Sequence, residues 1–379
     1  PFILESPCIM IFPLLMTVEQ TNKSYIPALD GLRGIAILFV VLYHNFGFIK
    51  QTSFGWLGVD LFFVLSGYLI TSILLKTVGE PGYLKNFFMK RVLRIFPLYF
   101  LCLVVFLIIF RIFGWYANEL SYYHENQWWL WTYLQNWLYA FTLKDGSAML
   151  VHLWSLAVEE QFYLIWPFVI LIVKKPKTLF FIMLGVLIFV IAARSVLWLY
   201  HFEDFNYTLI YTFTRIDGIC IGSMIALTMS FRPNFIGKNM AIIVVILAAL
   251  NFLFYFLNQI DTNSYPYFAF IGFTTFCGMF GLLLHELVTN KNTILSKVFS
   301  IKPLRFMGKI SYGFYVYHWP IFMMTQGYFF IFFKDNLNFQ HYYSGIAAST
   351  LSTLIAFIIS VISYYTFEKY FLRMKTKFN

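Results

Sequence analysis

Charged side chains are scarce in this chain. Only 12% of its 379 residues are Asp, Glu, Lys or Arg, whereas 60% are hydrophobic and the mean hydropathy is +0.73. A soluble globular domain carries about 25% charged residues, so this balance excludes one. Apolar runs of roughly 20 residues, the length of a membrane-spanning helix, recur from end to end. The composition predicts an all-α, polytopic membrane helical bundle.

Cysteine is also rare. Each of the four cysteines stands alone in an apolar context, with no CxxC pair: Cys8, Cys102, Cys220 and Cys277. This pattern indicates small core residues, and it predicts neither a disulfide framework nor a zinc site. We expect no bound metal.

The N-terminus lacks the features of a secretory signal peptide. Residues 1–16 are apolar, but they have no basic segment and no small-residue cleavage site. We interpret residues 1–25 as an N-terminal extension, with the natural start at Met10 or Met16. Residues 26–373 are expected to form one transmembrane domain, and residues 374–379 a basic cytoplasmic tail.

The loop charges predict the topology. The apolar runs predict about ten spans, at 30–49, 57–75, 92–113, 153–173, 178–200, 208–229, 241–258, 266–286, 310–330 and 343–368. With both termini cytoplasmic, most cations fall in inner loops, and the outer loops keep only Lys50, Arg111, Lys144 and Lys334. The net charge of +10 therefore reflects topology in a bacterial cytoplasmic membrane, and we expect lipid rather than nucleic acid as its partner.

Two further segments have open or simple interpretations. The long outer loop, about residues 114–151, is rich in Trp and Tyr. It is either an interfacial segment at headgroup level or an aromatic wall for an extracytoplasmic acceptor. Gly218 and Gly222 form a GxxxG pattern, which predicts close helix packing.

The first span carries the principal candidate site residues. Arg33 and His44 are eleven positions apart, which is about 16 Å along a helix. An imidazole inside an apolar span is costly to bury, so His44 is a functional candidate. Asp60 on the second span is expected at a similar depth, where its carboxylate would hold the His44 tautomer. The alternative is a structural buried pair.

Two more arginines precede the third span. Arg91 and Arg94 are three residues apart at the start of a predicted helix, so they face the same way. With Arg33 they would form a cytoplasmic cluster, and guanidinium groups bind phosphates bidentately. The alternative is topology-setting charge in contact with anionic lipid.

Later spans also contain ionisable residues. Glu159 and Glu160 point about 100° apart on a helix, so one is expected to face a cavity and the other to pair with Arg215 or Arg194. His318 precedes Pro320 by two residues. It is either catalytic or, in the interpretation we favour, bonded to the carbonyl freed by the helix break.

Five segments together resemble the acyltransferase-3 family of integral membrane acyltransferases, over about residues 26–371. They are DGLRG from Asp30 with its following His44, GVDLFFVLSGYLI from Gly58, RVLRIFPLY from Arg91, HLWSLAVEEQFYLIWP from His152 and SYGFYVYHWPI from Ser311. The resemblance implies transfer of an acyl group, usually acetyl, from cytoplasmic acyl-CoA to a hydroxyl of an extracytoplasmic glycan such as O-antigen, exopolysaccharide or peptidoglycan. Longer members carry a C-terminal SGNH hydrolase-like domain. None follows within these 379 residues, so we expect no second acyl-relay site here.

The family pattern assigns roles to several residues. The family's arginine, ten intervening residues and histidine match Arg33 and His44, and its RxxR pair matches Arg91 and Arg94, both associated with acyl-CoA use. We therefore expect CoA phosphates on the three arginines and the CoA arm threaded along the first span toward His44. His44 would be the general base, or less favourably would carry the acyl group itself.

The remaining candidates complete the predicted site. To catalysis we assign His44, Asp60, Glu159 and Glu160, and to substrate binding Tyr43, Ser66, His152, Trp154, Arg215 and His318. Tyr43, Ser66 and Trp154 are candidates for stabilising the oxyanion.

Two rival functions remain. A transporter or flippase would use the intramembrane ionisable groups as a relay, but it has no need of the arginine cluster. A membrane-bound O-acyltransferase of the His and Asn type would depend on His318 and tolerate loss of His44.

Overall fold

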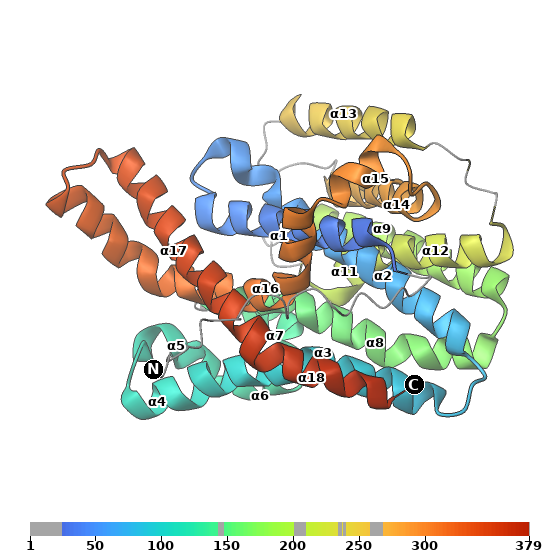
Figure 1. Cartoon of the computed structure of the whole chain (residues 1–379), viewed down its shortest axis with the longest axis horizontal. Coiled ribbons are helices and arrows are strands. Elements are labelled where there is room, and N and C mark those ends of the chain that lie inside the picture. Colours follow the sequence, from blue (N-terminus) through green and yellow to red (C-terminus); the bar gives the residue numbers. More distant parts are fainter. Residues whose placement is uncertain are drawn as a thin grey trace, which may run out of the picture.

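The computed structural model describes residues 25–142, 148–200, 210–233, 237, 240–257 and 268–378. Apart from Tyr25, the predicted N-terminal extension lies outside these residues, as does Asn379. Within the described ranges every regular element is helical (Figure 1). The α-helices are α1 (Pro27–Phe46), α2 (Leu57–Thr77), α3 (Tyr83–Leu103), α4 (Phe110–Phe113), α5 (Ala117–Glu125), α6 (Gln127–Trp131), α7 (Gln135–Thr142), α8 (Trp154–Val173), α9 (Pro176–Tyr200), α11 (Thr212–Arg215), α12 (Asp217–Phe231), α13 (Ala241–Leu257), α14 (Phe273–Thr289), α15 (Ile294–Phe299), α16 (Lys302–Ile331), α17 (His341–Ser363) and α18 (Lys369–Met374).

Several helices are long and apolar enough to cross a membrane. Among the described residues there are seven such segments: Pro27–Phe46, Lys50–Thr77, Tyr83–Phe113, Val151–Val173, Pro176–Tyr200, Phe270–Thr289 and His341–Lys377. The other three predicted spans coincide with α12, α13 and α16. The all-α, multi-pass membrane class is therefore confirmed, whereas the number ten and the cytoplasmic termini stay predictions.

Glycines set the closest helix contacts around α1. A Cβ at Gly55 would meet the carbonyl oxygen of Phe39, and a Cβ at Gly58 would meet that of Ala36. These contacts fix an antiparallel register of α1 against the segment 55–58, in which Gly55 lies against Tyr43 and Gly58 against Val40. We call it the glycine register. On its other side α1 packs along α16, and the two helices run side by side over much of their length.

The predicted GxxxG pattern packs as expected. A Cβ at Gly222 would meet the carbonyl oxygen of Val64, and one at Gly218 would meet the Phe63 side chain. Helix α12 therefore lies directly against α2. This contact carries the segment just before α12, which includes Arg215, to the first turns of α2.

A tight turn between α2 and α3 positions the second pair of arginines. Gly79 and Gly82 both have left-handed backbone angles, with φ of 94° and 76°, which favour glycine. Helix α3 begins at Tyr83, directly after the second of them. Arg91 and Arg94 therefore lie near the end of the bundle at which α2 finishes.

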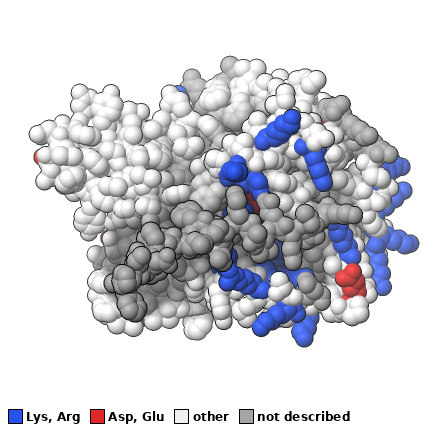
Figure 2. Space-filling model, viewed as in Figure 1, with Lys and Arg blue, Asp and Glu red and all other residues white. Residues whose placement is uncertain are grey.

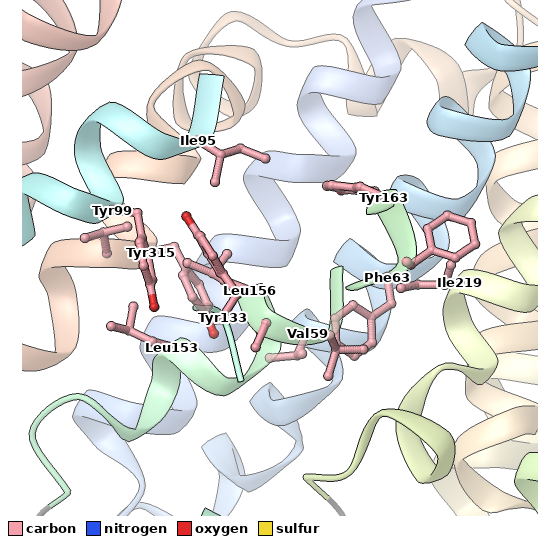
Figure 3. Packing of buried hydrophobic residues seen from close by; sticks show 14 of the residues in the cluster. Val59, Phe63, Ile95, Tyr99, Tyr133, Leu153, Leu156, Tyr163, Ile219 and Tyr315 are labelled. Atoms are coloured by element: carbon pink, nitrogen blue, oxygen red, sulfur yellow. The ribbon is translucent and has the colours of Figure 1, made fainter. Parts of the chain in front are cut away.

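Aromatic and aliphatic side chains from α2, α3, α8 and α16 fill the centre of the molecule (Figure 3). Tyr99 and Tyr133 stack with ring centroids 4.1 Å apart, and the Tyr99 hydroxyl donates to the Leu130 carbonyl. The expected core role of the described cysteines is confirmed, because Cys102, Cys220 and Cys277 are buried free thiols; Cys8 lies outside the described residues.

Cations concentrate at one end of the helical bundle. In Figure 2 the Lys and Arg side chains gather over the end where α18 finishes and α3 begins, and the opposite end, formed by the α16–α17 hairpin, is almost free of them in this view. This asymmetry is the one expected of a positively charged cytoplasmic face. The aromatic outer loop forms α5, α6 and α7, and both interpretations of it stay open.

Candidate functional site

Arg33, Arg91 and Arg94 line one cavity, as their positions in the sequence predict. The cavity holds about 810 Å³ of empty space, counted to its open mouth. Arg33 comes from α1, and an ion pair of 3.0 Å from its Nη1 to Asp30 Oδ1 holds its guanidinium. The remaining walls come from α2, α3, α8 and α16: Val59, Phe62, Phe63, Leu65, Ser66, Leu69, Ile70, Ile95, Ser155, Leu156, Glu159, Tyr163, Ser311, Tyr312 and Tyr315. We call this space the donor cavity.

The donor cavity runs along α2. Its lining on that helix extends from Ile70 to Val59, eleven residues or about 16 Å of helix. Arg33 is the contribution of α1 to this wall. The lining therefore combines three arginines with a largely apolar wall along the second span. The path of the CoA arm along the first span stays a prediction.

A second cavity adjoins the arginines. It measures about 540 Å³ and shares Arg33 and Arg94 with the donor cavity. Its other walls come from α1, α16 and the C-terminal helices. They comprise two carboxylates, two tyrosines and a lysine (Asp30, Glu368, Tyr312, Tyr364 and Lys309), together with Gly308 and Leu372. The guanidinium groups of Arg33 and Arg94 therefore border two spaces.

The two glutamates of α8 have different surroundings. Glu159 lines the donor cavity beside Ser66, whose hydroxyl is hydrogen-bonded to that of Tyr163. Glu160 Oε1 is buried and has no hydrogen-bond partner in the described part of the chain. The expectation that one glutamate faces a cavity is confirmed.

The expected pairing of a glutamate with Arg215 or Arg194 is wrong. Arg215 Nη2 lies 2.8 Å from Asp60 Oδ1, and Arg194 Nη1 lies 3.1 Å from Asp217 Oδ2. The physical reason is the close contact of α12 with α2, which carries Arg215 to Asp60. The guanidinium of Arg215 also stacks over Phe273, at 4.2 Å, and it is buried.

The predicted contact between Asp60 and His44 is also wrong. The glycine register places Asp60 opposite α1 residue 38, six residues or about 9 Å from the level of His44. The 3₁₀ segment Lys50–Trp56 runs back along α1, so α2 begins deeper in the bundle than its distance in sequence suggests. Asp60 is bound instead to Arg215.

The partner of His44 is His318. His44 Nδ1 and His318 Nε2 lie 2.8 Å apart, and the two rings are stacked with centroids 5.1 Å apart at 15°. Trp319 packs against the His44 ring at 5.0 Å. We call His44 and His318 the histidine pair.

Backbone carbonyls assign the protons of this pair. His318 Nδ1 lies 2.7 Å from the carbonyl oxygen of Tyr315 and 3.1 Å from that of Phe314. A carbonyl oxygen only accepts, so His318 Nδ1 carries the proton and, in a neutral imidazole, His318 Nε2 accepts. His44 Nδ1 must therefore donate, which leaves the lone pair on His44 Nε2. This is the protonation state that a general base requires.

His152, rather than His318, satisfies the carbonyl freed by the helix break. Pro320 has no N–H, so the carbonyl of Val316, four residues earlier, loses its helical partner. His152 Nε2 lies 3.2 Å from that oxygen and donates to it. The ring of His152 packs edge-on against His318, with centroids 5.5 Å apart. The favoured interpretation, in which His318 bonds the carbonyl freed by Pro320, is therefore wrong, because His152 bonds that carbonyl.

The remaining candidates are spread over the same region. Tyr43 is partly exposed and packs beside His44, with ring centroids 5.5 Å apart. Ser66 lies in the donor cavity. Trp154 packs edge-on against Phe63, and the Arg215 guanidinium lies 5.7 Å from its ring. Their roles, like those of His152 and Arg215 in substrate binding, stay predictions.

One residue that the structure places at the candidate site was not singled out from the sequence. Tyr315 lines the donor cavity and also packs against His152 and His318, at 5.6 Å and 5.7 Å between centroids. The available signal was spacing: Ser311, Tyr315 and His318 recur at i, i+4 and i+7 on one face of α16.

A family model, the acyltransferase domain, matches residues 26–365. The chain belongs to this acyltransferase family. Among curated relatives, the peptidoglycan O-acetyltransferase OatA of Listeria monocytogenes is 33% identical over 80% of this chain and 50% of its own length. The putative peptidoglycan O-acetyltransferase YrhL of Bacillus subtilis is 30% identical over 81% of this chain and 50% of its own length. The O-acetyltransferase OatA of Staphylococcus aureus is 30% identical over 82% of this chain and 53% of its own length.

The chain spans about half the length of the curated relatives that it matches. No solved structure matches the chain. The family resemblance stated from the five sequence motifs is confirmed. Because the relatives are named O-acetyltransferases, the transporter alternative is not favoured.

Proposed function

We propose that this membrane acyltransferase transfers an acetyl group from acetyl-CoA to a hydroxyl of an extracytoplasmic glycan of the peptidoglycan type. The observation that carries the proposal is the donor cavity, because Arg33, Arg91 and Arg94 all line it. CoA is a polyanion joined to its thioester by a long, thin arm, and guanidinium forks bind phosphates bidentately. The names of the relatives support acetyl as the acyl group and peptidoglycan as the acceptor class.

The donor would lie along α2. Phosphates on the three arginines place the pantetheine arm between α2 and α8, and the thioester toward Val59 and Ser155. The arginine end is the cytoplasmic end in this proposal, and the histidine pair lies toward the outer face. The positive end of the bundle in Figure 2 supports this topology, in which both termini lie inside a bacterial cytoplasmic membrane.

His44 would be the general base. Its Nε2 lone pair takes the proton from the acceptor hydroxyl while that oxygen attacks the thioester carbonyl. The new C–O bond forms, the C–S bond breaks, and the CoA thiolate leaves and receives the proton from His44. No acyl-enzyme is required in this route; the alternative, in which His44 Nε2 carries the acetyl group, remains open.

A binding measurement tests the donor assignment. The double variant Arg91→Ala with Arg94→Ala should weaken CoA binding at least about tenfold in isothermal titration, because two charge-assisted phosphate contacts are lost. Lys174→Ala with Lys175→Ala removes the same charge from an exposed loop and is the matched control, with unchanged affinity expected. Equal CoA affinity in the arginine variant and the control would show that Arg91 and Arg94 do not bind CoA.

A further inference from the structure

Tyr315 stands between the donor cavity and the histidine pair. On one side its ring lines the cavity and packs edge-on against Phe62, with centroids 6.4 Å apart. On the other side it contacts the rings of His152 and His318. None of the histidines is part of the cavity wall. A thioester in the cavity is therefore separated from His44 by this side chain.

Two hydrogen bonds hold the ring in this position. The Tyr315 hydroxyl donates to the carbonyl oxygen of His152 at 2.6 Å. The Ser155 hydroxyl lies 2.5 Å from the Tyr315 hydroxyl oxygen and donates to it. His152 belongs to the 3₁₀ turn Val151–Leu153 that leads into α8, and Ser155 belongs to the first turn of α8. Figure 3 shows Tyr315 close to Leu153 and Leu156 of this segment. The ring is anchored to α8 although its backbone belongs to α16.

The helix spacing gives the size of the gap. On α16, Ser311 lines the cavity, Tyr315 follows one turn later and His318 one turn after that. On α2 the cavity ends at Val59, which the glycine register places opposite α1 residue 39. His44 is five residues further on, or about 7 Å along the helix axis. Tyr315 contacts both sides of this interval, because it lines the cavity and packs against His318.

We propose that Tyr315 is a gate that decides whether the thioester is transferred to the acceptor or lost to water. The inference rests on the proposed function, because it takes the thioester to lie in the donor cavity and His44 to be the base. With the ring in the observed position, neither His44 nor water from the outer side reaches the thioester carbonyl. Transfer requires the Tyr315 ring to rotate away, and binding of the acceptor triggers this rotation.

Loss of the gate should redirect the reaction to water. A water molecule then takes the place of the acceptor hydroxyl, His44 Nε2 accepts its proton, and the water oxygen attacks the thioester carbonyl. The C–S bond breaks, and acetate and CoA thiol are released. Tyr315 is thus a positioning residue, and the measured quantity is the ratio of acetyl-CoA hydrolysis to acetyl transfer.

Two variants separate the ring from its anchors. Tyr315→Phe keeps the ring and loses both hydroxyl bonds, which should raise the hydrolysis-to-transfer ratio about tenfold for two hydrogen bonds of ordinary strength. Tyr315→Ala removes the ring and should raise the ratio further. Tyr317→Phe is the matched control, because it deletes a single hydroxyl bond, to Ser363, on the same helix. Its ratio should equal that of the wild type.

The assay uses the full chain in lipid nanodiscs. Thiol release from acetyl-CoA is followed without acceptor, acetyl transfer with a soluble peptidoglycan fragment, and CoA affinity by titration. An unchanged ratio in Tyr315→Phe, with CoA affinity retained, would overturn the gate. Tyr315→Phe decides the matter if Tyr315→Ala does not fold. Failure of the proposed function appears differently, as absence of CoA binding or of acetyl transfer in the wild-type protein.

Discussion

The hydrogen bond from His44 to His318 predicts a large, selective effect of substitutions at His318. His318→Leu removes the acceptor for the His44 Nδ1 proton, a bond of 2.8 Å. His44 is then free to move its proton to Nε2 and to rotate, so the base is lost in most molecules. General-base catalysis contributes about 10²- to 10⁴-fold, and loss of the correct tautomer costs a serine protease about 10⁴-fold. We expect acetyl transfer to fall by about 10²-fold or more.

A conservative variant distinguishes tautomer control from packing. In His318→Gln the amide oxygen can occupy the place of Nε2 and accept from His44 Nδ1. We expect His318→Gln to retain clearly more transfer activity than His318→Leu, with CoA affinity and thermal unfolding temperature similar in the two variants. The assay is transfer of labelled acetyl from acetyl-CoA to a peptidoglycan fragment. An equal loss in both variants, or no loss in either, would refute the tautomer argument.

The remaining predictions concern stability. Arg215→Leu leaves the Asp60 carboxylate buried and unpaired, so the free energy of unfolding should fall by about 3–5 kcal/mol, and Arg215→Leu with Asp60→Leu should recover most of it. The measurement is thermal unfolding in detergent, and a double variant as unstable as the single one would contradict a structural role for the pair. Gly58→Ala would drive a Cβ into the Ala36 carbonyl oxygen, so folded yield in size-exclusion chromatography should fall, whereas Gly185→Ala has open space and should be tolerated. Equal yields would refute the glycine register.

The sequence predicted the arginine cluster because its signals are local. Arg33 opens the first apolar run, and Arg91 and Arg94 share a helical face just before the third. Charges at the entries to neighbouring spans are confined to one membrane face, so their meeting follows from the topology. Which helices would wall the donor cavity depended on side-by-side packing, and α2 contributes the longest stretch of its lining, from Val59 to Ile70.

The partner of His44 could not be predicted in the same way. Depth estimated from sequence placed Asp60 level with His44, because the 3₁₀ segment Lys50–Trp56 was counted as loop rather than as chain returning along α1. His318 lies 274 residues from His44, and only the packing of α1 on α16 brings them together. Nothing in the sequence singled out Tyr315, because a tyrosine in an apolar helix is common. A histidine or carboxylate is noticed there because burying it in a membrane span costs free energy.

In the proposed reaction, His44 Nε2 is the base for acetyl transfer. The most direct measurement is the rate of acetyl transfer by His44→Ala in nanodiscs, alongside its CoA affinity and thermal unfolding temperature. We expect loss of acetyl transfer, with CoA affinity and thermal unfolding temperature close to those of the wild type. Acetyl transfer at near wild-type rate in His44→Ala would contradict the assignment of His44 as the base. If His318→Leu then lost transfer while His44→Ala kept it, the base would be His318.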